Sequence, residues 1–266
     1  MRTALVVGLG LAVLSLCTVP ARAEQTLTIP GTGASQVMLR ALGEAFSKQR
    51  PDLKVDVPDS TGSGGGIKAV GEGKAELGRV ARKIKEKEKG LGLTYLPFAR
   101  VPVVFAAHPS VKLKGLTAAQ SAAIFTGQVT SWKELGGPDK KIRVVTRAEG
   151  DSTLDALRAN LKEWADLKVT PLSKATDTDG ENADVLAATD GGAGYSVFDL
   201  AAKKGLTVFT LDGLTATNAA YPVQMVFGLV YKPEKLQGAA KEFVDFLFTP
   251  AAAKIIQGHG ADPLRR

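Results

Sequence analysis

The stretch Thr61-Gly-Ser-Gly-Gly-Gly-Ile-Lys68 lies between a strand-like run at 54–58 and a helix-like run at 67–74. Its glycines permit positive φ and let a ligand approach the main chain without meeting a Cβ atom. Successive N–H groups in such a turn, followed by a helix N-terminus, favour a small anion. The alternative is a plain flexible turn. The stretch is neither a P-loop nor a dinucleotide fingerprint, because it lacks Gly-x-x-x-x-Gly-Lys-Ser/Thr and no acidic partner closes a βαβ unit.

Two further segments repeat this order of strand, polar glycine turn and helix. Upstream, Pro30-Gly-Thr-Gly-Ala-Ser35 follows a short strand, and Ser35 is placed to cap the next helix. Downstream, a buried strand at 142–146 ends at Arg147, and Gly150-Asp-Ser-Thr153 precedes another helix. Alternating strands and helices predict an α/β fold with largely parallel sheets. In such sheets ligands bind beyond the C-terminal strand ends, where we expect the three turns to converge.

Several other elements can be read from hydrophobic periodicity and capping signals. Long apolar runs at 101–107 and 223–231 predict two long strands, and a helix is expected around 182–188. Thr117 and Gln120 form a capping box ahead of a further helix. The helix after Ser35 is expected to bury one apolar stripe, made of Met38, Leu39, Leu42 and Phe46.

The first 23 residues are predicted to be a signal peptide. Arg2 supplies a positive start, residues 5–16 an apolar core, and Ala21-Arg-Ala23 a cleavage motif, so we expect cleavage before Glu24. A buried N-terminal helix is the alternative. Cys17 lies inside this segment, so the mature chain cannot form disulfides, which fits a bacterial periplasm. The remaining chain is ordinary in composition for one or two globular domains, with 44% hydrophobic and 23% charged residues overall.

The charge balance favours small anions over nucleic acid as partners. Without Arg2 and Arg22, 32 basic side chains remain against 27 acidic ones, a net charge of +5. A modest positive field gathers anions. Aromatic residues make up 6% of the chain and do not alternate with basic runs, so no nucleic-acid partner is expected. No His/Cys/Asp cluster has metal-ligand spacing, so neither a metal nor another cofactor is expected.

An enzyme is the main alternative class. Ser152 next to Asp151 suggests a nucleophile, yet the Gly-x-Ser-x-Gly motif is absent and no histidine is near in sequence. His108 and His259 stand at a strand end and in a glycine-rich turn, where a structural role is more common. We therefore expect no catalysis.

The sequence resembles the phosphate-binding periplasmic proteins of ABC transporters over nearly the whole mature chain. The matching motifs are Gly31-Thr-Gly-Ala-Ser35, Gly62-Ser-Gly-Gly-Gly-Ile-Lys68, Glu76-Leu-Gly-Arg-Val-Ala-Arg82, Ile124-Phe-Thr-Gly-Gln-Val-Thr-Ser-Trp132 and Arg147-Ala-Glu-Gly-Asp-Ser-Thr153. The resemblance implies a type II periplasmic binding protein: two lobes, each a mixed, mostly parallel sheet flanked by helices, that close on a ligand by hinge motion. It implies a monomer that delivers inorganic phosphate, or a similar oxyanion such as sulfate, arsenate or phosphonate, to a membrane ABC permease. A receptor domain that feeds a signalling partner would use the same site.

The resemblance also assigns lobes and ligands. Residues 24–104 with 223–266 would form lobe one and residues 105–222 lobe two, with crossing strands at 103–107 and 223–229. The ligand-binding residues carried over by position are Ser35 and the N–H of Gln36, Ser63 and Gly64, and Arg147, Asp151, Ser152 and Thr153. Ser35 and Ser63 could instead serve only as helix caps.

Two departures from the family's pattern bear on ligand choice. Ala81 stands where the family usually has Asp or Ser, and Asp151 where it usually has Ser. One hypothesis is that Asp151 accepts the proton of phosphate and so rejects sulfate. The other is that Asp151 only caps a helix. Arg79 and Arg82 in the same neighbourhood are expected to be surface residues or partners in salt bridges between the lobes rather than ligands.

Overall fold

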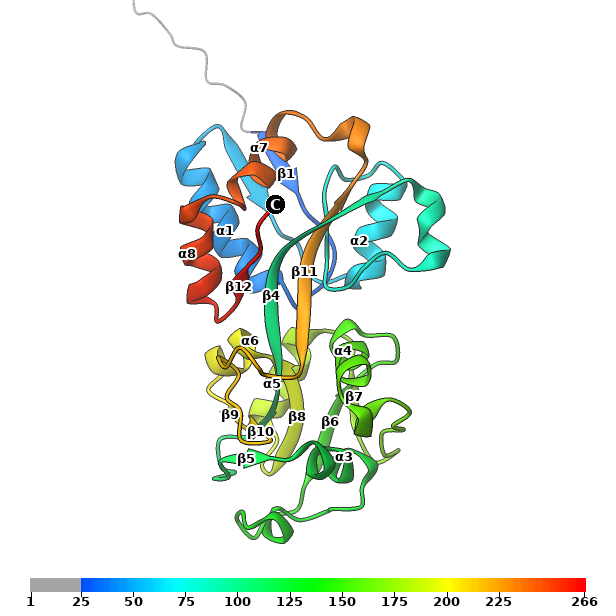
Figure 1. The fold of residues 1–266 in the computed structure, drawn as a ribbon, viewed down its shortest axis with the longest axis vertical. Coiled ribbons are helices and arrows are strands. Elements are labelled where there is room, and N and C mark those ends of the chain that lie inside the picture. The colour runs from blue at the N-terminus through cyan, green and yellow to red at the C-terminus, as the bar shows by residue number, and fades with distance from the viewer. Residues whose placement is uncertain (1–24) are drawn as a thin grey trace, which may run out of the picture.

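The computed structural model describes residues 25–266, which form two lobes, one above the other in Figure 1. The predicted signal peptide and Cys17 lie outside the described residues. Two long strands, β4 (Thr94–Ala107) and β11 (Gln224–Tyr231), run between the lobes and pair antiparallel. The two-lobe α/β fold with two crossing strands is therefore confirmed. The residue boundaries of the lobes stay a prediction.

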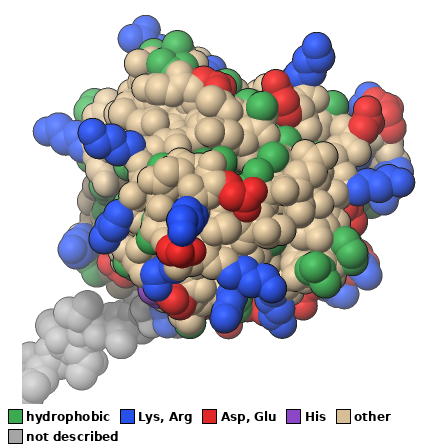
Figure 2. Space-filling view, turned by 90° about the horizontal axis from the view of Figure 1, so that it is seen from below, with side chains coloured by type: hydrophobic (Ala, Val, Ile, Leu, Met, Phe, Trp, Pro, Cys, Tyr) green, Lys and Arg blue, Asp and Glu red, His purple; other side chains and the backbone are tan. Residues whose placement is uncertain are grey.

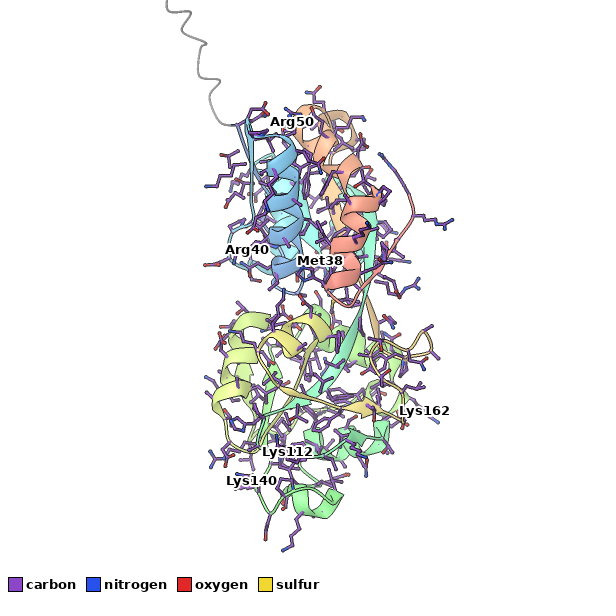
Figure 3. The ribbon with its side chains drawn as sticks, turned by 90° about the vertical axis from the view of Figure 1, so that its left-hand side faces the viewer. Met38, Arg40, Arg50, Lys112, Lys140 and Lys162 are labelled. Carbon is purple, nitrogen blue, oxygen red and sulfur yellow. The ribbon has the colours of Figure 1, made fainter. Side chains whose placement is uncertain are left out.

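Lobe one, the upper lobe, is built from both ends of the described chain. Its elements are β1 (Gln25–Thr28), α1 (Gln36–Gln49), β2 (Leu53–Asp56), α2 (Gly62–Gly71), β3 (Gly78–Val80), α7 (Gly238–Phe246), α8 (Pro250–Gly258) and β12 (Asp262–Pro263). Two 3-10 helices, Glu86–Leu91 and Pro233–Lys235, join them. Helices α1 and α8 pack side by side, with Met38 on the buried side of α1 (Figure 3).

Lobe two, the lower lobe, comes from the middle of the chain. Its elements are β5 (Gly115–Leu116), α3 (Ala118–Thr126), β6 (Arg143–Arg147), α4 (Ser152–Asn160), β7 (Lys174–Thr176), α5 (Asp179–Ala188), β8 (Gly192–Val197), α6 (Phe198–Lys203), β9 (Thr207–Val208) and β10 (Thr210–Leu211). Two 3-10 helices, Trp132–Leu135 and Lys162–Trp164, complete the lobe.

The strand pairing is more mixed than the sequence predicts. The shorter pairs β1/β2, β5/β10, β6/β7 and β6/β8 are parallel, as expected. Every pair that involves β4 or β11 is antiparallel, including the pair that these two strands form with each other between the lobes. The prediction of mostly parallel sheets is wrong for the central strands. The order β3-β11-β4-β8-β6-β7 links both lobes through these two strands.

Helix positions follow burial and capping. The expected stripe of α1 is buried, and the Thr117–Gln120 capping box starts α3. Thr249 caps α8 ahead of Pro250, the position where proline suits a helix start. Ser35 differs from the prediction: it precedes α1, but its side chain makes no capping hydrogen bond.

The glycine-rich stretch is not a loop before a helix, because it forms the first turns of α2 itself. The reason lies in how closely α2 packs on β3 and on the turn before α1. A Cβ at Gly66 would lie 2.9 Å from the carbonyl oxygen of Arg79 and 3.0 Å from Gly31 Cα and the carbonyl oxygen of Pro30. Glycine is therefore required for this approach rather than for flexibility.

The outer surface of lobe two carries charges of both signs. Seen from below, lysine, arginine and acidic side chains are interspersed, with hydrophobic side chains in small groups between them (Figure 2). Within residues 25–266, no helix combines the length and the apolar character needed to cross a membrane.

Candidate anion-binding site

A cavity of about 390 Å³ lies between the lobes and is lined by residues from both of them. Lobe one contributes Ser63 and Gly64, and lobe two contributes Arg147, Asp151 and Ser152. The structure thus brings together five of the predicted site residues. They come from the second and third glycine turns, as expected from the rule that ligands bind at strand ends.

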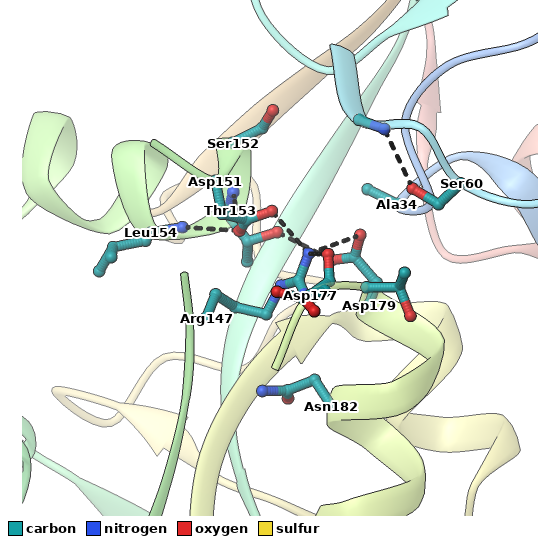
Figure 4. Close-up of polar contacts among 12 residues, drawn as sticks. Ala34, Ser60, Arg147, Asp151, Ser152, Thr153, Leu154, Asp177, Asp179 and Asn182 are labelled. Atoms are coloured by element: carbon teal, nitrogen blue, oxygen red, sulfur yellow. Dashed lines mark hydrogen bonds and ion pairs between the residues drawn. The ribbon is translucent and has the colours of Figure 1, made fainter. Parts of the chain in front are cut away.

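Three helix N-termini meet at this cavity. The first residues of α2, α4 and α5 (Gly62, Ser152 and Asp179) all line it. A helix N-terminus carries partial positive charge and unpaired N–H groups, which makes it suited to an anion. Figure 4 shows the lobe-two part of this arrangement, with Ser60 and Ala34 of lobe one facing it.

The start of α2 has backbone N–H groups that no side-chain cap of Thr61 engages. Thr61 precedes the helix and makes no side-chain capping hydrogen bond. The N–H groups of the first helical turn cannot bond within the helix. The N–H of Gly62 is occupied by Ser60 Oγ at 3.3 Å, which leaves the N–H groups of Ser63 and Gly64 for a ligand. By contrast, α4 and α5 are capped by Asp151 and Thr178.

Two serines bridge the cleft between the lobes. Ser63 Oγ and Ser152 Oγ are 3.1 Å apart, and both residues are buried. Ser63 Oγ also accepts the N–H of Ala81 at 3.1 Å. Lys85 Nζ of lobe one makes a second contact between the lobes, with Asp155 Oδ2 of lobe two at 3.4 Å. Asp155 lies on α4, the helix that begins at Ser152.

Arg147 is held at the end of β6 by neighbours on three sides. Its N–H donates to Tyr195 Oη at 3.0 Å, and its guanidinium donates to the carbonyl oxygens of Thr176 and Asp177, each at 3.1 Å. It also pairs with Asp151 at 2.8 Å. Its buried Nε has no hydrogen-bond partner among the described residues.

Asp151 is fully engaged. Its Oδ1 accepts the N–H groups of Thr153 at 2.9 Å and Leu154 at 3.3 Å, and its Oδ2 pairs with Arg147. This is the geometry of a helix cap. Thr153 lies behind the cavity wall, where its hydroxyl donates to Asp179 at 3.0 Å. Thr153 therefore does not line the cavity, and it holds Asp179, which does.

Asp179 is a site residue that the sequence analysis missed. It opens α5, is buried, and lies 3.7 Å from Arg147. Burial raises its pKa to about 6, repulsion from Asp151 adds to the shift, and Arg147 opposes it. The missed signal was the spacing Thr178-x-x-Glu181, a helix-start pattern in which Thr178 Oγ1 accepts the N–H of Glu181.

Burial also disfavours the charge of Arg147, but the carboxylates of Asp179 and Asp151 outweigh this effect. The pKa of Arg147 is therefore raised above its ordinary value. The guanidinium and the two carboxylates form one buried ionic group. Such a group is costly to break, since removing one partner leaves a buried charge unpaired.

The first glycine turn contributes different residues from those predicted. Thr32 and Gly33 line the cavity, whereas Ser35 and Gln36 do not. The N–H of Gln36 donates to the carbonyl oxygen of Gly33 at 3.0 Å, so it is already used within the turn. Ser35 Oγ is buried without a hydrogen-bond partner among the described residues. A Cβ at Gly33 would lie 3.1 Å from Asp179 Oδ2 across the cleft, which accounts for glycine there.

The neighbouring arginines have structural roles in lobe one. Arg79 is fully buried, contrary to the expectation of a surface residue or a bridge between the lobes. It donates to the carbonyl oxygens of Ile29, Thr32 and Pro58 and so fixes the first turn. Burial lowers its pKa to about 10. Arg82 lines the cavity but pairs with Glu88 through two contacts of 2.8 Å inside the same lobe.

The cavity does not attract anions through net charge. Its lining carries four cationic side chains (Arg82, Lys85, Lys87 and Arg147) and five carboxylates (Glu88, Glu149, Asp151, Asp177 and Asp179). Hydrogen-bond donors and helix ends must therefore provide the selectivity. Within the described part of the chain, no group of three or more His, Cys, Asp or Glu residues is arranged to hold a metal ion.

Comparisons with known proteins agree on one family. A family model described as a PBP superfamily domain matches residues 18–251. The phosphate-binding protein PstS of Bacillus subtilis is 32% identical over 235 residues, which cover 85% of this chain and 76% of that protein. A Clostridium perfringens protein, described as a phosphate ABC transporter substrate-binding protein and solved with bound phosphate, aligns with a TM-score of 0.82 at 30% identity, covering 91% of this chain and 100% of that one. An ABC-type phosphate transport receptor from Vibrio cholerae shares the fold, with a TM-score of 0.66 at 22% identity over 89% of this chain and 99% of that one.

Proposed function

The chain belongs to the PBP superfamily and, within it, to the family of PstS phosphate-binding proteins, and we propose that it binds inorganic phosphate between its two lobes. The observation that carries the proposal is the uncapped N-terminus of α2, with Ser63, facing Ser152 and Arg147 across one cavity. These groups are hydrogen-bond donors from both lobes. A bound tetrahedral anion would therefore hold the lobes together.

Phosphate would take the place of the direct contact between Ser63 and Ser152. Each hydroxyl would donate to an oxygen of the anion, joined by the N–H groups of Ser63 and Gly64 and by the guanidinium of Arg147. Hydrogen bonds to a charged group contribute about 1.5–3 kcal/mol each, so a few of them suffice for tight binding. Asp151 and Thr153 would position this set by capping α4 and holding Asp179.

The wider role follows from the family. We propose an exported receptor that delivers phosphate to a membrane ABC permease and catalyses no reaction. Support comes from the relatives, whose names describe binding and transport proteins. The site itself offers no histidine: His108 contacts Ser110, and His259 contacts Asp199, both outside the cavity lining.

Calorimetric titration of the mature protein with inorganic phosphate tests this function directly. We expect one phosphate per chain with a dissociation constant in the micromolar range or below, about −8 kcal/mol or stronger. A phosphatase assay with a chromogenic phosphate ester should show no turnover. Absence of phosphate binding up to millimolar concentrations would overturn the proposal, and turnover lost in Ser152→Ala would favour an enzyme instead.

A further inference from the structure

A polar contact between the lobes lies away from the anion cleft, at the end of α8. His259 follows α8 in lobe one, and its Nδ1 lies 2.7 Å from Asp199 Oδ2 on α6 of lobe two. Each of these two side chains is only 11% exposed. In Figure 1, α8 lies above α6 on the left of the crossing strands, whereas the Lys85–Asp155 contact involves α4 on the right. The lobes are thus tied together on both sides of β4 and β11.

The main chain of lobe one is held against α6 at this contact. The N–H of His259 donates to the carbonyl oxygens of Ile255 and Ile256 at 3.2 and 3.1 Å, which fixes the turn at the end of α8. A Cβ at Gly260 would lie 2.5 Å from Cδ1 of Phe198, the first residue of α6. That distance is too short for a contact between carbon atoms, and the φ of +68° at this position also favours glycine. The two lobes therefore pack directly against each other beside the His259 ring.

The hydrogen between the two side chains belongs to His259. An ionised carboxylate only accepts hydrogen bonds, so Nδ1 donates to Asp199. Lys203 of α6 lies 3.4 Å from Asp199 Oδ1 and 3.2 Å from Nδ1, so one carboxylate and one ammonium group face the ring. Nδ1 can donate in the neutral ring as well as in the charged one, so the contact does not require a charged histidine.

The position of this pair makes it sensitive to closure of the lobes. Neither residue lies on β4 or β11, the strands that connect the lobes, so rotation of one lobe against the other changes the distance between His259 and Asp199. A contact that is made only in the closed arrangement shifts the population toward that arrangement. A ligand that binds between the closed lobes then binds more tightly.

We infer that His259 and Asp199 are positioning residues for anion binding, because together they form a latch that holds the lobes closed without touching the anion. The inference rests on the proposed function, since it assigns to the latch a share of the affinity for phosphate. Both residues lie outside the cavity lining, so replacing them removes no hydrogen-bond donor from the anion.

Calorimetric titration of a double-mutant cycle with inorganic phosphate tests the latch. His259→Ala and Asp199→Ala should each weaken phosphate binding by about fivefold or more, and the double variant should lose no more than the weaker-binding single variant, because either change already removes the pair. His259→Asn keeps a side-chain N–H donor near the position of Nδ1 and should restore most of the affinity. His108→Ala is the matched control and should bind phosphate like wild type, because His108 contacts Ser110 and Asp190 within lobe two.

Small-angle X-ray scattering of the ligand-free proteins gives a measurement that does not depend on phosphate. His259→Ala should have a larger radius of gyration than wild type and His108→Ala, because fewer of its molecules are closed. Saturating phosphate should return His259→Ala to the wild-type value, which a misfolded variant would not do.

The outcomes separate the latch from the proposed function. Unchanged phosphate affinity in both single variants, or losses that simply add in the double variant, would overturn the latch and leave phosphate binding standing. Failure of wild-type protein to bind phosphate would overturn the proposed function. The scattering of the ligand-free proteins would then decide the latch, and equal radii of gyration for wild type and His259→Ala would overturn it as well.

Discussion

The hydroxyl oxygens of Ser63 in lobe one and Ser152 in lobe two lie 3.1 Å apart, so a hydrogen bond links the two lobes at the cleft. Ser63 is also tied to Ala81, which fixes its side chain from within lobe one. The pair marks the point at which a ligand would replace contact between the lobes. Its two members can be removed one at a time without cutting a salt bridge.

We expect Ser63→Ala to lower phosphate affinity by about tenfold or more, since one hydrogen bond to a charged ligand contributes about 1.5–3 kcal/mol. Calorimetric titration measures the change. Ser47→Ala is the matched control, because it removes a lobe-one hydroxyl that bonds only the main chain at Val55. Wild-type affinity in Ser63→Ala would show that this serine serves the fold and not the ligand.

Arg147→Ala is expected to reduce phosphate affinity by about a hundredfold or more, because charge-assisted bonds to the anion contribute about 1.5–3 kcal/mol each. The same change leaves Asp151 and Asp179 without their buried partner, so the melting temperature should fall as well. Calorimetry and thermal unfolding measure the two effects. Arg143→Ala, at an exposed position on the same strand and outside the cavity lining, serves as control. Unchanged affinity in Arg147→Ala would contradict the site assignment.

The parts of the fold that could be predicted are those that depend on short-range pattern. The stripe of Met38 and its neighbours and the capping box at Thr117 each fall within a few residues, so their periodicity and spacing identify them. The two crossing strands could be predicted because each contains a long apolar run. The relative direction of neighbouring strands could not be predicted, since it depends on where β4 and β11 enter each lobe.

The site was predictable in composition but less so in detail. Ser63, Arg147 and Ser152 follow strand ends and therefore converge, as the α/β architecture requires. The first turn differs from the prediction because Gln36 uses its N–H inside the turn and Ser35 is buried outside the cavity lining. Asp179 was missed because its role comes from contact with Arg147, a residue 32 positions earlier in the sequence. No local pattern encodes that contact.

Asp179 should make stability depend on pH. Its pKa is about 6 in the folded protein, against about 4 for an ordinary aspartate in the unfolded chain. Between these values the folded protein keeps a proton that the unfolded chain has lost. The contribution to the free energy of unfolding is therefore fully present below about pH 4 and is lost as the pH rises through about 6.

Urea unfolding of wild-type protein and of Asp179→Asn at several pH values measures this effect. The asparagine cannot titrate, so wild-type protein should lose stability relative to the variant between about pH 4 and pH 7. Asp177→Asn, at an exposed position two residues away, controls for the loss of one negative charge. Parallel stability curves for wild type and Asp179→Asn over this range would contradict the buried titration.

Discrimination between phosphate and sulfate separates the two hypotheses for Asp151. Near neutral pH phosphate still carries a proton and sulfate carries none, so a carboxylate that accepts this proton would reject sulfate. In the structure both oxygens of Asp151 are occupied, one by the N–H groups that start α4 and the other by Arg147. Asp179 has one oxygen bonded to Thr153, and its other oxygen lies 3.7 Å from Arg147. The geometry therefore favours a capping role for Asp151 and makes Asp179 the better candidate for accepting the proton.

We accordingly expect Asp151→Ser, in which serine can still cap the helix, to leave the ratio of phosphate to sulfate affinity within about threefold of wild type. Asp179→Asn should raise sulfate affinity relative to phosphate by about tenfold or more, a change of about 1.4 kcal/mol. Titrating the three proteins with both anions near pH 8, where the Asp179 carboxyl of pKa about 6 is ionised, makes the comparison direct. A tenfold gain of sulfate in Asp151→Ser and none in Asp179→Asn would reverse the assignment, because only a residue in contact with the proton of phosphate can change this ratio while the fold is kept.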